Sequence, residues 1–117
     1  MNKTIVILSP EAEEAYDTLE LMSSKHKAEK IILKGLKKEI GILKFDIHYG
    51  DPVEKKLIPK EYLIRYNATN FFRVELPAYW RLLYKLDNDP AEDAIVVLIP
   101  DIIDHETYNK KFGYKGR

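Results

Sequence analysis

The sequence contains no cysteine, which excludes disulfide bonds and thiolate chemistry. Its three histidines, His26, His48 and His105, lack the short spacing of metal-ligand motifs, so we expect no metal site. No apolar run is long enough to cross a membrane, and no signal peptide is visible, so we expect a cytoplasmic protein without a membrane partner. The chain also lacks internal repeats, a glycine-rich phosphate loop and a nucleophile motif.

What remains is a chain of 117 residues, 45% of them hydrophobic, which predicts one globular domain over residues 1–117. The formal net charge is zero, but it is unevenly distributed. Residues 1–24 hold one lysine and five acidic residues, whereas residues 25–60 hold ten lysines and five acidic residues. The lysine excess can contact nucleic acid or an acidic partner, or it can be a solvated helix face. The neutral total argues against tight, sequence-independent nucleic-acid binding.

The most informative stretch is residues 71–86, which we predict to be two strands joined by a turn at residues 77–79. Apolar side chains alternate with charged ones on both sides of Pro77, the period-2 pattern of strands. Matching the apolar faces sets Val74 opposite Leu82 and Phe72 opposite Tyr84, because a slip of one residue would oppose apolar and charged side chains. Glu75 then lies opposite Arg81.

The preceding segments predict a strand and a helical hairpin. Residues 4–8 are apolar and β-branched, which is typical of a strand buried on both faces. Ser9 and Pro10 suit the N-cap and first position of a helix that breaks at residues 23–24. A second helix begins near residues 25–28, with an apolar stripe through Leu36, Ile40 and Leu43 that continues to Ile47. We expect Gly35 and Gly41 to let the two helices approach closely.

The remaining segments are less regular. Residues 62–66 fit a short strand or a helical turn, and the apolar residues 94–99 predict a central strand closed by Pro100. Residues 101–117 have too few apolar residues to predict a helix. The chain as a whole predicts an α+β fold in the order β-α-α-β-β-β. In that fold the hairpin, through Leu36 and Ile40, covers one face of a largely antiparallel sheet.

Two interpretations of Arg81 stay open on the pattern alone. It can form a cross-strand ion pair with Glu75, contributing a few tenths to about 1 kcal/mol. Alternatively, Arg73, Arg81 and Lys85 can form a cationic site on a sheet face that no helix covers.

The order of elements resembles the RelE/ParE toxin superfamily. The residues that carry the resemblance are KLIPKEY at 56–62, FRVELPAYWRLLYKL at 72–86 and AIVVLIPDIIDHETYNKKFGYK at 94–115. LPAYWRLLY looks like the family's strand-turn-strand signature. HETYNKKFGY looks like the C-terminal segment of its RelE-like branch in archaea and bacteria.

The resemblance implies the toxin of a type II toxin–antitoxin system, neutralised by a cognate antitoxin. RelE-like toxins are ribosome-dependent endoribonucleases that cleave mRNA in the A site, inhibiting translation without metal or cofactor. By resemblance, Arg81 contacts the scissile phosphate, Arg73 is a basic residue of the preceding strand, Tyr108 orients the base, and His105 occupies a basic or catalytic position. Lys85, Lys110 and Lys111 complete the candidate RNA-binding residues.

Glu75 departs from the family pattern, because ribosome-cleaving members carry a lysine there. It can serve as the general base, or it can neutralise Arg81 and leave an inactive site. The alternative to an RNA-cleaving enzyme is therefore a catalytically inactive or ParE-like protein that has the toxin fold and acts by binding a protein such as DNA gyrase. Neither the oligomeric state nor the codon preference follows from the sequence.

Overall fold

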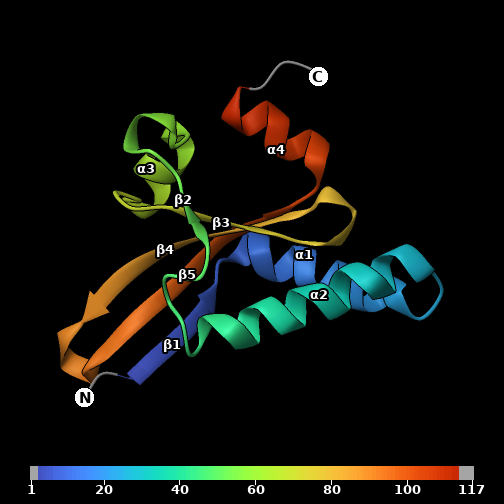
Figure 1. Cartoon of the computed structure of the whole chain (residues 1–117), viewed down its shortest axis with the longest axis horizontal. Helices are drawn as coiled ribbons and strands as arrows, with labels where there is room; N and C mark the ends of the chain where they lie inside the picture. The colour runs from blue at the N-terminus through green and yellow to red at the C-terminus, as the bar shows by residue number, and fades with distance from the viewer. Residues whose placement is uncertain (1–2, 114–117) are drawn as a thin grey trace.

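The computed structural model describes residues 3–113. It is an α+β fold with one mixed, mostly antiparallel sheet (Figure 1). The strands are β1 (Lys3–Leu8), β2 (Asp51–Pro52), β3 (Phe72–Glu75), β4 (Arg81–Asp89) and β5 (Ala94–Ile103). The helices are α1 (Pro10–Ser23), α2 (Lys27–Leu43), α3 (Lys60–Tyr66) and α4 (His105–Phe112), with 3-10 turns η1 (Lys55–Leu57), η2 (Pro77–Tyr79) and η3 (Pro90–Glu92). The strand order is β1-β5-β4-β3-β2, and β1 and β5 are parallel.

The helical hairpin covers one face of the sheet, as the apolar stripe predicted. In Figure 1 α1 and α2 run side by side along the sheet. Ser9 caps α1, since its hydroxyl accepts a hydrogen bond from Ala12 N at 3.0 Å. Leu36 and Leu43 are fully buried in the core that the hairpin forms with β3, β4 and β5, and Ile40 is partly buried. The expected extension of α2 to Ile47 is wrong, because the helix ends at Leu43.

A second core lies on the other face of the sheet, which the sequence had suggested was uncovered. It packs α3 and α4 against the strands, with residues Ile58, Tyr62, Ala68, Phe71, Leu83, Ile103 and Tyr108. The ambiguous residues 62–66 belong to helix α3, and residues 105–112 of the tail, for which the sequence predicted no helix, form helix α4. Asp104 caps α4 by accepting from Thr107 N at 2.8 Å, and Gly113 ends it with φ of 75°. These caps stabilise both ends of α4, which explains why the segment is helical although it has few apolar residues.

The predicted strand pairing over residues 71–86 is confirmed. Val74 pairs with Leu82, Phe72 with Tyr84, and Glu75 with Arg81. The turn is the η2 segment, in which Ala78 and Tyr79 adopt positive φ angles of 59° and 62°. This fixed register sends Arg73 and Arg81 to the α4 side of the sheet.

Three smaller expectations are wrong. β1 is an edge strand whose side chains are only partly covered, not a strand buried on both faces. β5 does not stop at Pro100 but continues to Ile103, pairing with β4 beyond an irregularity between Leu83 and Lys85. Gly35 does not bring α1 and α2 together. It faces the ring of Pro77 instead, so it allows α2 to approach the η2 turn.

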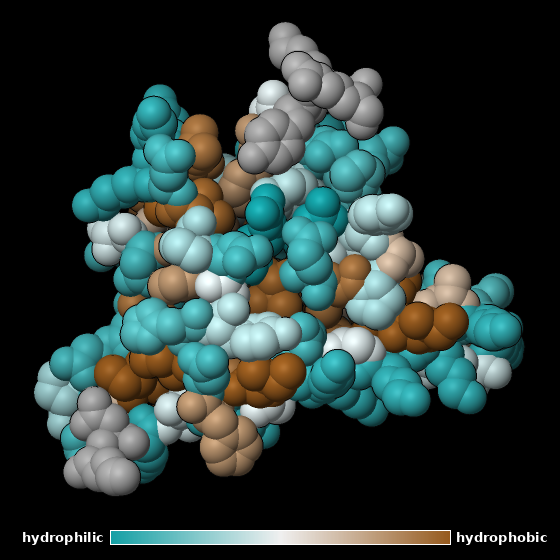
Figure 2. Space-filling model, in the orientation of Figure 1, coloured by the Kyte–Doolittle hydropathy of each residue, from teal (hydrophilic) through white to brown (hydrophobic). Residues whose placement is uncertain are grey.

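None of the helices in the described part of the chain is both long and apolar enough to span a membrane. The face shown in Figure 2 is mainly hydrophilic. Apolar side chains show on it between the α3–α4 part of the molecule and the hairpin, and along the hairpin itself.

Candidate functional site

The predicted site residues on the β3–β4 strand pair lie next to helix α4. Arg73 on β3 donates a hydrogen bond from Nη1 to the hydroxyl of Tyr108 on α4, at 2.8 Å. The guanidinium carbon of Arg81 on β4 lies 4.7 Å from the centroid of the same tyrosine ring, within the range of a cation–π contact. The structure thus brings Arg73, Arg81 and Tyr108 together. With Glu75 we call them the arginine cluster.

Glu75 lies between the two arginines. Its Oε2 is 3.1 Å from Arg81 Nε and 3.5 Å from Arg73 Nε, so one half-exposed carboxylate pairs electrostatically with both cations. Both Nε atoms are nevertheless buried without a hydrogen-bond partner. The distances satisfy an ion pair but the N–H directions do not satisfy a hydrogen bond. The cluster therefore contains two buried guanidinium N–H donors whose hydrogen bonds Glu75 does not complete.

The two arginines differ in how far they are buried. Arg81 is only 8% exposed, lies beneath Tyr108, which is 2% exposed, and also donates to the backbone carbonyl of Tyr79. Arg73 is more accessible, and the hydrogen bond with Tyr108 raises its pKa further above the ordinary arginine value, so it stays charged. An anion therefore reaches Arg73 first and reaches Arg81 only if Tyr108 moves aside.

A groove of about 270 Å³ borders the accessible part of the cluster. Besides Arg73 and Glu75, it is lined by Glu39, Tyr49, Gly50 and Asp51, which come from α2 and the segment before β3. The sequence showed no pattern that joined these residues to the site. Asp51 meets it through the short β2–β3 pairing, and Glu39 comes from α2, where it accepts a hydrogen bond from Tyr49.

His105 lies at the start of α4, next to the cluster. Its exposed ring contacts the ring of Tyr79 at 5.7 Å between centroids, and its Nε2 is 3.3 Å from Asn109 Nδ2. Tyr79 in turn accepts the hydrogen bond from Arg81, so His105 is connected to the arginine through one residue.

The three candidate lysines do not join the cluster. Lys85 is only 4% exposed and donates to the carbonyls of Tyr66 and Asn67, at 2.6 and 3.4 Å, at the end of α3. The expectation that Lys85 shares an uncovered face with Arg81 is therefore wrong, because the segment around α3 covers it. Lys110 is exposed on α4. Lys111 points to α3, where it bonds to both carboxylate oxygens of Glu61 at 2.9 Å.

A polar network that the sequence did not indicate holds α3, β5 and α4 together. The hydroxyl of Tyr62 donates to Asp101 at 2.6 Å, and Lys111 lies 3.8 Å from the same carboxylate. Burial raises the pKa of Asp101 despite the opposing effect of the Tyr62 hydrogen bond. Because this network fixes α4 over the sheet, it also positions Tyr108 above Arg81.

Guanidinium groups bind phosphate oxygens well, but Tyr108 covers Arg81, so Arg73 is the more accessible of the two cations. Glu75 is the carboxylate paired with both arginines, and His105 is the imidazole at the edge of the cluster. Within residues 3–113, no three histidine or acidic side chains gather in a way that would hold a metal ion. Comparison of the chain with models of protein families, with curated proteins and with solved structures finds no match.

Proposed function

We propose that this protein is a RelE-like toxin that cleaves mRNA on the ribosome without metal or cofactor. The observation that carries the proposal is the arginine cluster, two guanidiniums on adjacent strands with buried, unsatisfied Nε–H donors around one half-exposed carboxylate. The start of the chain, one strand and two helices, and the later antiparallel strands β3, β4 and β5 also support the family resemblance, although β2 and α3 intervene and α4 follows. The proposed setting is the cytoplasm, where ribosomes and mRNA are found.

In this proposal the 2′-hydroxyl oxygen of one nucleotide attacks the adjacent phosphorus, and the bond to the 5′-oxygen breaks. The products are a 2′,3′-cyclic phosphate and a free 5′-hydroxyl. Arg73 and Arg81 stabilise the charge that develops on the phosphorus oxygens. Glu75 accepts the proton of the 2′-hydroxyl, and His105 donates one to the leaving oxygen. Tyr108 must move from Arg81 for both arginines to grip the phosphate, which leaves its ring free to stack on a base.

A second candidate function is supported by the burial of Arg81. A guanidinium that is 8% exposed, paired with Glu75 and covered by an aromatic ring is also what a purely structural cluster looks like. The protein would then have the toxin fold without the ribonuclease activity and act by binding a protein, as the ParE branch does on gyrase.

Conservative variants separate the two functions. Arg81→Lys and Arg73→Lys keep a positive charge but lose the planar fork that binds two phosphate oxygens. We expect each to reduce cleavage of mRNA on programmed ribosomes by about 10²-fold or more. Arg65→Lys is the matched control, because Arg65 is an exposed arginine that pairs with Glu11 on α1 and should not affect cleavage.

The measurement maps new RNA 5′ ends after incubation with ribosomes matched to the host, with thermal unfolding of each variant alongside. If the wild-type protein does not cleave, the enzymatic proposal fails and protein binding remains. If both lysine variants cleave as well as wild type, the arginines are structural.

The proposal also includes an antitoxin. The excess of lysine in residues 25–60, with Lys34 and Lys38 exposed on α2, suits an acidic segment of such a partner. Co-expression with the adjacent open reading frame should give a complex whose affinity falls as salt rises. Recovery of the protein without any partner from its native host would contradict this part of the proposal.

A further inference from the structure

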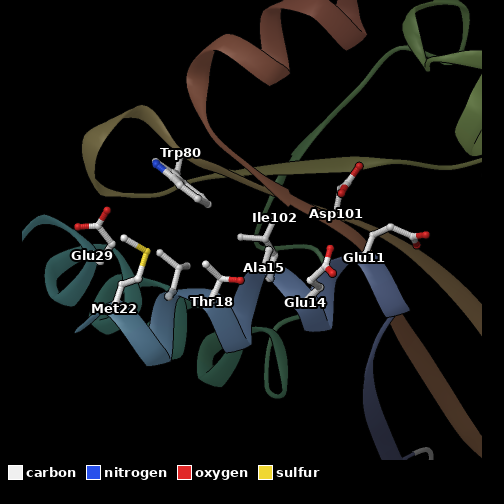
Figure 3. Close-up of a pocket in the computed structure, with 10 residues that line it drawn as sticks. Glu11, Glu14, Ala15, Thr18, Met22, Glu29, Trp80, Asp101 and Ile102 are labelled. Atoms are coloured by element: carbon white, nitrogen blue, oxygen red, sulfur yellow. The ribbon is translucent and has the colours of Figure 1, made fainter. Parts of the chain in front are cut away.

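A groove of about 490 Å³ lies on the α1 side of the sheet, away from the arginine cluster. Its apolar lining comes from Ala15, Leu19 and Met22 of α1, from Trp80 after the η2 turn, and from Ile102 of β5. Figure 3 shows Trp80 standing across the groove from Thr18 and Met22. Trp80 is the single tryptophan of the chain, and it remains partly exposed.

The rim of this groove is acidic. Glu11, Glu14, Glu29 and Asp101 line it, and none of the described residues that line it is basic. Two of these carboxylates are already engaged: Glu11 accepts from Arg65 at 2.7 Å, and Asp101 accepts from Tyr62 at 2.6 Å. Glu14 and Glu29 form no ion pair within residues 3–113, and in Figure 3 they lie toward opposite ends of the groove. We call this feature the acidic groove.

The surface continues beyond the acidic groove. A shallower hollow on the outer side of α1 shares Glu14 and Thr18 with it and adds Glu13, Asp17 and Leu21. Leu21 is 79% exposed and adds an accessible apolar side chain to this hollow. Apolar contacts flanked by carboxylates therefore extend along α1 over more than the acidic groove alone.

We propose that the acidic groove, with the outer face of α1, binds a basic amphipathic helix of a partner protein. An apolar side chain of that helix enters between Trp80 and Met22, while lysine or arginine side chains pair with Glu14 and Glu29. The flat indole also favours a cation at its face. This docking does not depend on the proposed ribonuclease activity, since it uses none of the arginine cluster.

The chemistry of the surface selects this occupant over the others. RNA is disfavoured because every charged group on the rim is a carboxylate, which repels phosphate. A small amine would fill only the acidic groove and would not contact the hollow around Leu21 on the outer side of α1. A second copy of this chain offers the lysine-rich α2, but the apolar stripe of α2 is buried in its own core and leaves only Ile31, at 48% exposure, on the lysine side.

Trp80 supplies the reporter for a direct test. The full chain is titrated with a synthetic 14-residue Leu/Lys amphipathic helix, and Trp80 emission is followed. We expect a blue shift that saturates, because the indole leaves water when the groove fills. A Leu/Glu peptide of the same pattern and an all-Lys peptide should produce no saturable shift. Raising the salt concentration should weaken binding of the Leu/Lys peptide.

Charge-neutralising variants locate the contact. Glu14→Gln combined with Glu29→Gln should weaken binding of the Leu/Lys peptide by about three- to tenfold. Glu106→Gln, a change at an exposed glutamate of α4 that does not line the groove, should leave it unchanged. The proposal is overturned if the Leu/Lys peptide does not bind, if the double variant binds it as wild type does, or if spermine produces the same shift. It is also overturned if Trp80 emission shifts with protein concentration alone, which would identify a second copy as the occupant.

Discussion

Two glycines of helix α2 give opposite predictions for the same substitution. Gly35 and Gly41 are both helical, and glycine is less favourable than alanine in a helix by about 0.5–1 kcal/mol. Propensity alone therefore predicts that either Gly→Ala change stabilises the protein. A Cβ at Gly41 meets nothing within 4 Å, whereas a Cβ at Gly35 would lie 2.5 Å from Cδ and 2.8 Å from Cγ of Pro77.

The overlap at Gly35 outweighs the gain in propensity. The Pro77 ring cannot rotate away, so α2 and the η2 turn must separate, and overpacking of this kind costs about 1–3 kcal/mol. We expect Gly35→Ala to lower the free energy of unfolding by about 1–2 kcal/mol after the propensity gain. Gly41→Ala should raise it by about 0.5–1 kcal/mol.

Urea unfolding of both variants at the same temperature measures the difference through the transition midpoint. A third variant identifies the cause. In Gly35→Ala combined with Pro77→Ala the ring atoms that clash are gone, so the loss for the pair should be smaller than the sum of the two single losses. If Gly35→Ala is as stable as wild type, or if the two losses simply add, the close approach of α2 to Pro77 is not what makes Gly35 necessary.

Three further predictions concern the core, a buried charge and acid stability. Leu36→Ala should destabilise the protein by about 2–5 kcal/mol in urea unfolding, because the side chain is fully buried. A smaller loss would mean that helices α1 and α2 pack loosely against the sheet. Lys85→Met should cost about 1–3 kcal/mol, since two carbonyls at the end of α3 lose their donor; an unchanged midpoint would show that water replaces it. Hydrogen bonds from Arg65 and Tyr66 lower the pKa of Glu11 from 4.5 to about 2. The stability this gives is present above pH 4.5 and is lost as the pH falls toward 2, so Glu11→Gln should show a shallower loss of stability in that range.

The hairpin over residues 71–86 was predictable because three independent signals agree there. The period-2 alternation, the proline at the turn and the matching of apolar faces all give one register, and Arg81 opposite Glu75 follows from it. The apolar stripe of α2 was equally readable, since Leu36 and Leu43 recur at helical spacing and meet the sheet. Both are local patterns that burial of one face reinforces.

The coverage of the other sheet face was not predictable from the same patterns. Helix α4 has one buried residue, Tyr108, and is defined by its caps at Asp104 and Gly113 rather than by an apolar stripe. Lys85 alternates in phase with Arg81 along the strand, which suggested a shared surface. An irregularity in the β4–β5 pairing and the segment after α3 place it against backbone carbonyls instead. Such contacts join distant parts of the chain and leave no periodic trace.

Because α4 covers Arg81, Glu75 has a structural role that the zero net charge of the chain does not reveal. Arg81 is only 8% exposed, and a buried cation is destabilising unless an anion pairs with it. Glu75 supplies that partner from the neighbouring strand while keeping half its side chain in water. Glu75 therefore stabilises the arginine cluster independently of the proposed ribonuclease activity. Its replacement by lysine would set three cations around Tyr108 with no anion among them. In the proposed ribonuclease, an RNA phosphate would compete with Glu75 for the two guanidinium groups.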